Sequence, residues 1–178
     1  MPATAHPSSH APRGNALRAC AHTLVAIAIA AILADTWLVG GLWRPMFVSG
    51  PSMGEAAEGR QVWVDRAAYA YRAPRRFETV VLRWPEAPRE LCIKRVVGFP
   101  GEVVEIADGQ IVVDGNVAAR DASLADVYYQ TGPARQYRLG PAEYFVLGDN
   151  SSRSLDSRHW SPKRGVTSEM LLGPAVTW

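Results

Sequence analysis

The chain has 178 residues, of which 48% are hydrophobic, and a formal net charge of +2 at neutral pH. This length supports one domain with a core of its own, and the interspersed charges exclude the basic footprint of a nucleic-acid-binding protein. The two cysteines, Cys20 and Cys92, lie outside any spacing typical of a zinc site or a disulfide framework. We therefore expect free thiols, no metal and no other cofactor.

The N-terminal segment 1–18 is rich in Pro, Ser, Ala and His and has no acidic residue, which predicts a disordered cytoplasmic tail. Segment 19–43 carries Asp35 as its only formal charge and is long enough for a membrane-spanning helix. Arg13 and Arg18 lie on its near side, so the positive-inside rule keeps the N-terminus in the cytoplasm.

Two other interpretations of segment 19–43 stay open. It can be a cleaved signal peptide whose apolar core ends at Ala34, or a buried helix of a soluble domain. We favour a retained anchor in the cytoplasmic membrane, because apolar character resumes after Asp35 and continues to Trp43. Trp37 and Trp43 also suit the far membrane interface. Residues 44–178 then form a domain on the extracytoplasmic side.

After Trp43, short β-rich runs bounded by Gly and Pro replace any helical periodicity. The pair Asp108-Gly109 between two apolar runs predicts a tight hairpin, whereas 121–141 is expected to be a longer connection. The sequence thus predicts an all-β domain of mostly antiparallel sheets. The expected strands are 45–48, 61–64, 79–84, 91–97, 103–106, 110–113 and 144–147.

The run LCIKRVV, residues 91–97, places two adjacent cations in an apolar strand. Side chains alternate across a strand, so Lys94 shares one face with Cys92 and Val96 while Arg95 lies on the other. Both faces are apolar, and we expect the strand to be covered on both sides. A lysine there finds a partner, reaches solvent, or is desolvated with its charged form disfavoured. Arg95 stays charged and needs an acidic partner or a route to water.

Three segments contain residues suited to nucleophilic catalysis: SGPSM at 49–53, the lysine strand, and GDNSSRSLDSRHW at 148–160. The hydroxyl of Ser52 is a weak nucleophile that needs a base, and a desolvated Lys94 can be that base. Each segment alone also has an ordinary structural explanation, as a turn serine, a solvent-reaching lysine or a polar loop. We expect His159 to be structural, although a serine-histidine pair stays open.

Taken together and in this order, SGPSM, CIKRVVGFPGE and GDN followed by SLDSR resemble bacterial type I signal peptidases. These are membrane-bound serine proteases that remove signal peptides from exported proteins. The resemblance covers most of 48–160 and includes AYAYRAPRR and VEIADGQIVVDG. It implies an all-β catalytic domain outside the cytoplasmic membrane, with Ser52 as nucleophile and Lys94 as general base.

The same resemblance implies roles for neighbouring residues. The Ser154 hydroxyl would orient the Lys94 amine, and the backbone N–H of Ser52 would donate to the oxyanion. Some members carry a second, hydroxyl donor two residues before the nucleophile, but Gly50 stands there, so this donor is missing or comes from elsewhere. The residues expected to support the active site are Met53, Arg95, Asp149, Asp156 and Arg158.

The chain departs from the family pattern beside the nucleophile. Where the family usually has Pro-Thr, this chain has Glu55-Ala56, following Gly54. Two Gly-Asp pairs that are usual in the family are replaced here by Gly59-Arg60 and Phe77-Glu78. These changes leave the catalytic residues intact but alter the strand beside the serine. They favour a specialised relative, such as one that serves a conjugation or pilus system.

The leading hypothesis is a membrane-anchored serine endopeptidase that removes Ala-x-Ala signal peptides from preproteins with a Ser/Lys dyad. Its partners would be these signal peptides and membrane lipid, but no nucleic acid. The aromatic side chains expected to hold the site at the membrane are Trp43, Phe47 and Trp63. Packing in the core is an equal alternative for Phe47 and Trp63. Alternative functions are a peptidase dedicated to a pilin precursor and an inactive membrane-anchored domain that binds export substrates. A self-cleaving stress-response repressor is disfavoured because no DNA-binding segment precedes the β domain.

Overall fold

The computed structural model describes residues 13–118, 136–160 and 165–176, and it divides the chain into two units, Met1–Gly41 and Leu42–Trp178. Helix α1, Arg13–Leu42, begins inside the segment that we expected to be a tail. Apolar side chains along it, such as Leu24 and Ile32, are exposed. Within the described ranges, no helix combines the length and the hydropathy of a candidate membrane span.

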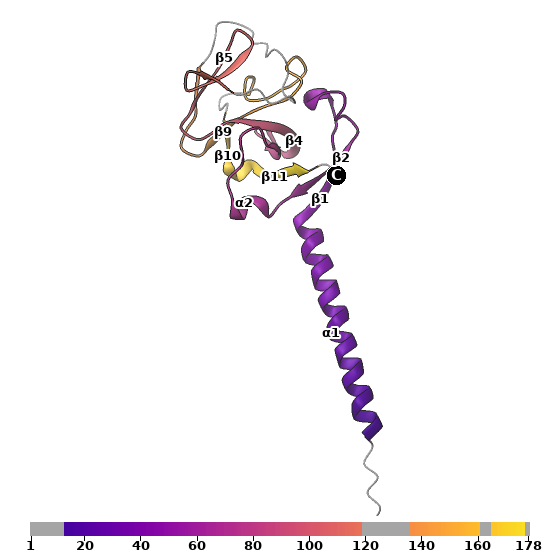
Figure 1. The fold of residues 1–178 in the computed structure, drawn as a ribbon. Coiled ribbons are helices and arrows are strands. Elements are labelled where there is room, and N and C mark those ends of the chain that lie inside the picture. Colours follow the sequence, from indigo (N-terminus) through magenta and orange to yellow (C-terminus); the bar gives the residue numbers. More distant parts are fainter. Residues whose placement is uncertain (1–12, 119–135, 161–164, 177–178) are drawn as a thin grey trace, which may run out of the picture. The chain divides into compact units, whose positions relative to one another are not determined.

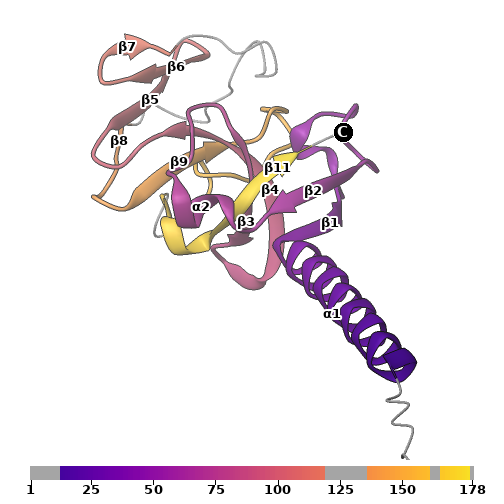
Figure 2. The ribbon, with the colours of Figure 1, turned by 60° about the horizontal axis from the view of Figure 1, so that its bottom comes forward.

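The second unit is built from two antiparallel sheets (Figure 1). The larger has the strand order β1-β2-β11-β3-β4-β9-β10 and the smaller β7-β6-β5-β8. Figure 2 shows β5 to β8 gathered at one end of this unit. The strands of the larger sheet are β1 (Trp43–Phe47), β2 (Gln61–Asp65), β3 (Thr79–Trp84), β4 (Ala87–Gly98), β9 (Glu143–Leu147), β10 (Val166–Thr167) and β11 (Leu171–Val176). Those of the smaller are β5 (Val103–Ala107), β6 (Gln110–Val113), β7 (Asn116–Val117) and β8 (Gln136–Arg138).

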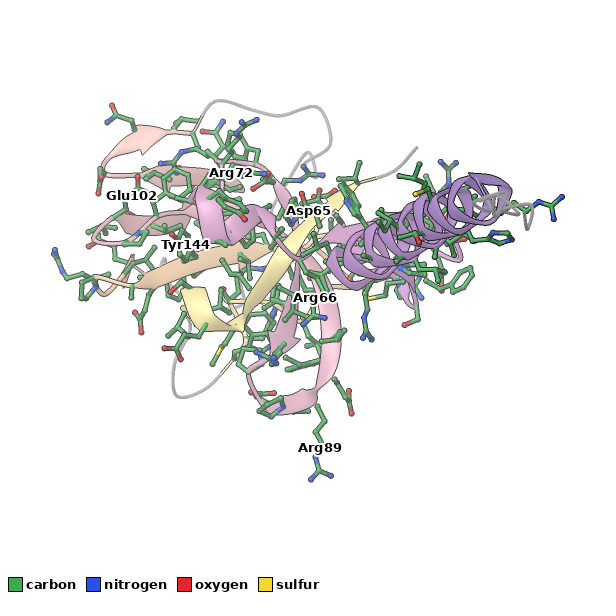
Figure 3. All side chains as sticks on the ribbon, turned by 90° about the horizontal axis from the view of Figure 1, so that it is seen from below. Asp65, Arg66, Arg72, Arg89, Glu102 and Tyr144 are labelled. Carbon is green, nitrogen blue, oxygen red and sulfur yellow. The ribbon has the colours of Figure 1, made fainter. Side chains whose placement is uncertain are left out.

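Among the described residues, three short helices complete the second unit. They are the 3-10 helices η1 (Pro51–Met53) and η2 (Ser168–Met170) and the α-helix α2 (Ala68–Tyr71). The carboxylate of Asp65, at the end of β2, accepts hydrogen bonds from the backbone N–H groups just before and at the start of α2 (Figure 3). This contact fixes the turn that leads from β2 toward β3.

The all-β prediction is confirmed for the second unit, and all seven expected strands are present. β3 and β6 have the predicted bounds, whereas β4 begins four residues earlier than expected. The sequence does not predict β11, because Gly173 and Pro174 interrupt its apolar run. Gly173 lies at an irregularity in the pairing with β3, where a Cβ would collide with the Asp65 carbonyl. β8 falls in the expected connection 121–141, of which 121–135 lies outside the described residues.

The predicted hairpin is confirmed between β5 and β6, where Ala107 pairs with Gln110. Asp108 and Gly109 both have positive φ, 49° and 77°. Two consecutive residues in this conformation form the type I′ turn, whose twist matches that of the flanking strands. Asp108 and Gly109 therefore occupy the two turn positions that require a positive φ.

β4 contributes to every buried apolar cluster of the second unit. Ile93 packs with Val48, Met53 and β2, and Val96 packs with Trp160 and residues of β3 and β9. Val97 belongs to a third cluster between the smaller sheet and β9. The expectation that this strand is covered on both sides is confirmed from Ile93 onward, whereas Leu91 is 48% exposed. It also explains how a lysine in its middle becomes buried.

Candidate active site

Ser52 lies on η1, just after the edge strand β1. Gly50 and Gly54 flank it with φ of 89° and 86°, a region that favours glycine. Met53 faces inward, is 9% exposed and packs with Val48 and Ile93. The glycine-bounded turn thus buries the methionine, whereas Ser52 lines a pocket.

Lys94 comes from the middle of β4, and its side chain is buried at 3% exposure. Its Nζ is 2.9 Å from Ser52 Oγ and donates to the carbonyl of Ile93 at 3.0 Å. The pKa of Lys94 is lowered, chiefly because burial penalises the ammonium form; the nearby Cys92 and Asp156 oppose this effect. The structure therefore joins two residues 42 positions apart into a serine-amine pair with a destabilised charge.

Arg95 points to the opposite side of β4 and is fully engaged. Its guanidinium makes a two-pronged ion pair with Asp149, at 2.7 and 2.6 Å, and donates to the Phe77 carbonyl at 2.6 Å. The expected acidic partner of Arg95 is thereby confirmed. Phe77 has a φ of 63°, an unusual conformation for a bulky residue, at a position where the family usually has glycine.

Asp156 and Arg158 form a second, fully buried ion pair. The Arg158 Nε donates to one carboxylate oxygen at 2.9 Å, and the Gly148 N–H donates to the other at 3.0 Å. Arg158 also donates to the hydroxyl and the carbonyl of Ser151. Burial alone would raise the pKa of Asp156, but the nearby His159 ring and the hydrogen bonds from Arg158 outweigh it and hold the pKa well below its usual range. The cluster braces the loop that follows β9.

His159 belongs to this cluster and not to the serine. Its Nδ1 is 3.6 Å from Asp156 Oδ1, and the side chain is 40% exposed. The structural interpretation of His159 fits this contact. Sequence reasoning did not single out Gly148 or Ser151; the GDNSS motif that contains them was the available signal.

Ser154 is buried beside Ser52, but it does not make the contact expected of it. Its Oγ has no hydrogen-bond partner among the described residues, and the Lys94 amine instead donates to the Ile93 carbonyl. Ser154 packs against Gly148, where a Cβ would collide with both Ser154 Oγ and the Ser52 carbonyl. Asn150 N–H donates to the same Ser52 carbonyl at 3.0 Å. The loop after β9 therefore holds the backbone of Ser52.

A pocket of about 530 Å³ opens beside Ser52 and Lys94. Its walls are the segments 46–52 and 90–94, together with Trp84, Arg153 and Leu155. Phe47 lines it and is 68% exposed, so the core-packing alternative is wrong for this residue. Trp43 and Trp63 are half-buried, which leaves their role a prediction.

A serine hydroxyl within hydrogen-bond distance of a desolvated amine is the arrangement expected of serine hydrolases that use lysine as base. The family described as "Signal peptidase, peptidase S26" matches residues 20–178, and the chain belongs to this family. The resemblance drawn from the sequence motifs is thereby confirmed. Membership makes the chain a serine endopeptidase.

Two individual relatives agree with this assignment. Signal peptidase I V of Bacillus subtilis is 33% identical over 135 residues, covering 66% of this chain and 76% of that protein. Probable signal peptidase I-2 of Synechocystis is 29% identical over 158 residues, covering 86% of this chain and 68% of that protein. A crystal structure of a signal peptidase I from Enterococcus faecalis is 28% identical, with a TM-score of 0.49, and covers 58% of this chain and 97% of that one.

Proposed function

We propose that the chain cleaves signal peptides from exported preproteins with Ser52 as nucleophile and Lys94 as general base. The observation that carries the proposal is the 2.9 Å separation of Lys94 Nζ and Ser52 Oγ, made by a lysine whose pKa is lowered. A neutral amine at this distance can accept the serine proton, which an ordinary ammonium cannot.

The reaction follows from these two groups. Ser52 Oγ attacks the scissile carbonyl while its proton moves to Lys94 Nζ, and the lysine returns the proton to the leaving amine. The neutral Lys94 amine then takes a proton from water, whose oxygen attacks the acyl ester, and it passes that proton to Ser52 Oγ as the ester bond breaks. The backbone N–H of Ser52 is the proposed oxyanion donor. Ser154 is a proposed positioning residue for the lysine, a role that requires the amine to leave the Ile93 carbonyl.

The substrate is proposed to bind as an added strand. β4 pairs with β3 along most of its length, but its pairing with β9 begins only at Arg95. Among the described residues, 87–94 therefore has no strand on its second side, and the pocket runs along 90–94. An extended peptide can satisfy this open backbone edge and bring its scissile bond to Ser52. Small side chains of an Ala-x-Ala site are the proposed occupants of the part of the pocket beside Ser52.

Segment 19–43 is proposed as the anchor, with the catalytic domain outside the cytoplasmic membrane. The exposed apolar side chains of α1 and the exposed Phe47 support contact with lipid. Sodium carbonate extraction of membranes from cells that produce the full chain tests the anchor. Recovery in the soluble fraction would contradict it, and an externally added protease that leaves the catalytic domain intact in spheroplasts would contradict the orientation.

Cleavage of a preprotein carrying an Ala-x-Ala site by the purified full chain in detergent tests the activity. We expect product from the wild type and from Ser168→Ala, whose serine is exposed on η2, but none from Ser52→Ala or Lys94→Ala. Mass spectrometry of the product would locate the cut. A folded wild type that leaves the preprotein intact would overturn the general signal peptidase.

The second candidate is a peptidase dedicated to one precursor, such as a pilin. It is favoured by the turn 54–59, which begins at Gly54 directly after η1 and carries Glu55 and Ala56 where the family usually has Pro-Thr. A chain that cuts a pilin precursor but no Ala-x-Ala preprotein would establish it. A chain that binds such substrates without cutting any would instead support the inactive binding domain.

A further inference from the structure

The two long walls of the pocket lead to the serine-lysine pair from the same end. One wall passes from Met46 to Ser52 and the other from Glu90 to Lys94, so the catalytic pair closes one end of the groove. Glu90 lies at the opposite end of its wall, four residues before Lys94. An extended strand rises about 3.3 Å per residue, which places Glu90 about 13 Å along the groove from the lysine.

Glu90 is an exposed carboxylate at the groove, without a partner among the described residues. Glu90 lies where the pairing of β4 with β3 shifts register, between Ala87 and Leu91, and it lines the pocket together with Cys92 and Lys94. Its neighbour Arg89 does not line the pocket and projects away from the domain (Figure 3). The carboxylate is therefore not neutralised by the adjacent cation, and it remains available to a bound chain.

The opposite charge stands near the catalytic end of the same pocket. Arg153 lines the pocket and is exposed, and it directly precedes Ser154, which packs beside the Ser52 carbonyl through Gly148. Like Glu90, its side chain has no ion-pair partner in the described part of the chain. The groove thus has a carboxylate at its far end, and it is also lined by an arginine whose neighbour Ser154 packs beside Ser52.

We infer that Glu90 is a specificity-determining residue, which selects substrates with a basic side chain about four residues from the scissile bond. This inference rests on the proposed function, and it narrows the substrate class of that same site. A lysine at that position meets Glu90, whereas a lysine close to the scissile bond meets Arg153 and is repelled. A glutamate in the substrate is repelled by Glu90 and attracted by Arg153. The order of charges along the peptide therefore becomes part of the recognition.

The size of the effect follows from the exposure of both groups. An exposed pair in water is weak, so we expect a two- to five-fold difference in kcat/KM, roughly, between peptides with lysine and glutamate at this position. Salt at about 1 M shortens the Debye length to about 3 Å and should remove most of the difference. Alternation along an extended peptide should confine the preference to one position, with little effect at its two neighbours.

Peptides that share one Ala-x-Ala site provide the test. A single lysine, glutamate or glutamine is moved one position at a time along each side of the scissile bond, and kcat/KM is measured with the full chain in detergent. We expect a lysine preference at one position about four residues from the cut. Glu90→Gln should remove it, and Glu90→Lys should reverse it toward glutamate. Glu169→Lys makes the same charge change outside the pocket and should keep the wild-type preference.

The outcomes separate the inference from the proposed function. If the glutamine peptides are cut but no position distinguishes lysine from glutamate, the role of Glu90 is overturned and the peptidase stands. A preference that survives Glu90→Lys, or that Glu169→Lys reverses equally, also overturns it. If the folded wild type cuts none of the peptides and none of the preproteins, the proposed function and the inference fail together.

Discussion

Two buried cations of this chain, Lys94 and Arg158, lie in opposite surroundings. Lys94 contacts a hydroxyl and a carbonyl, and no carboxylate among the described residues pairs with it. Arg158 is matched by Asp156 in an ion pair in which the two side chains are only 3% and 0% exposed. Both charges lost their water when the chain folded, but only Arg158 received a counter-charge in exchange.

The difference in partners gives different chemistry to two corners of the site, namely the surroundings of Lys94 and the surroundings of Arg158. Without a counter-charge, burial lowers the pKa of Lys94 and makes the neutral amine accessible, which suits a base. Where a counter-charge is present, the pKa of Asp156 is lowered and both Asp156 and Arg158 stay charged. Such an ion pair is suited to hold the loop after β9 in place. The same physical cost of desolvation therefore produces a reactive group in one corner and a rigid support in the other.

The largest expected effect comes from replacing the unmatched cation. Lys94→Met keeps the length of the side chain but removes the base, and we expect kcat/KM to fall by about a thousand-fold or more. Stability should not fall with it, because a buried amine without a counter-charge is costly; a gain of about 1 kcal/mol is expected. Peptide cleavage measures the change in kcat/KM, and urea unfolding measures the change in stability. Loss of stability comparable to that of a broken ion pair would show that Lys94 is structural.

The matched pair should respond in the opposite way. Asp156→Asn leaves Arg158 buried without its counter-charge, and we expect a loss of about 3–5 kcal/mol in the free energy of unfolding. Urea denaturation followed by circular dichroism measures it. Glu105→Gln, on the smaller sheet, is the control and should change stability by less than about 0.5 kcal/mol. Equal losses in the two variants would remove the contrast between the corners.

The pH dependence of activity sharpens the comparison. Because the pKa of Lys94 is lowered, kcat/KM should rise with pH and level off below the ordinary lysine value of about 10.4. The unfolded chain binds more protons between the lowered pKa and that value, so stability should also rise with pH in this window. This contribution is lost as pH falls through the pKa of the folded state. A pH profile whose acid limb has its midpoint near 10.4 would contradict a desolvated base.

Ser154 lies between the two corners and should show the smallest effect on stability. Its buried Oγ has no partner among the described residues, so Ser154→Ala is expected to change the free energy of unfolding by less than about 1 kcal/mol, toward greater stability. A positioning role predicts a lower kcat with little change in KM. Restored activity in Ser154→Thr would support that role, whereas full activity in Ser154→Ala would exclude it.

Local patterns in the sequence predicted much of the β domain because the responsible interactions are local. Asp108-Gly109 suits a type I′ turn wherever it occurs, and the alternation in 91–97 shows that both faces of β4 are apolar. The central strand β11 escaped prediction, since its Gly173-Pro174 pair fits only through a close approach to Asp65. The contact that makes this glycine necessary involves a residue more than a hundred positions away.

The candidate site likewise combines features that local sequence patterns predicted with contacts that they did not predict. The motifs identified Ser52, Lys94 and the support residues, and the apolar neighbours of Lys94 predicted its desolvation. They did not reveal that Arg95 binds Asp149 and the Phe77 carbonyl, or that Ser154 packs on Gly148 without reaching the lysine. Pairing of charged side chains depends on distances of a few ångströms across strands, which no spacing within the chain determines.

By itself the sequence determined the family, the β class of the catalytic domain and the two residues that we propose carry the reaction, because these depend on residue type and local pattern. The tertiary structure decided which buried charge has a counter-charge and which does not. It also placed Glu90 and Arg153 at a common groove although 63 residues separate them. Reactivity and selectivity depend on solvent exclusion and on charges brought together through space, and both arise only when distant segments pack.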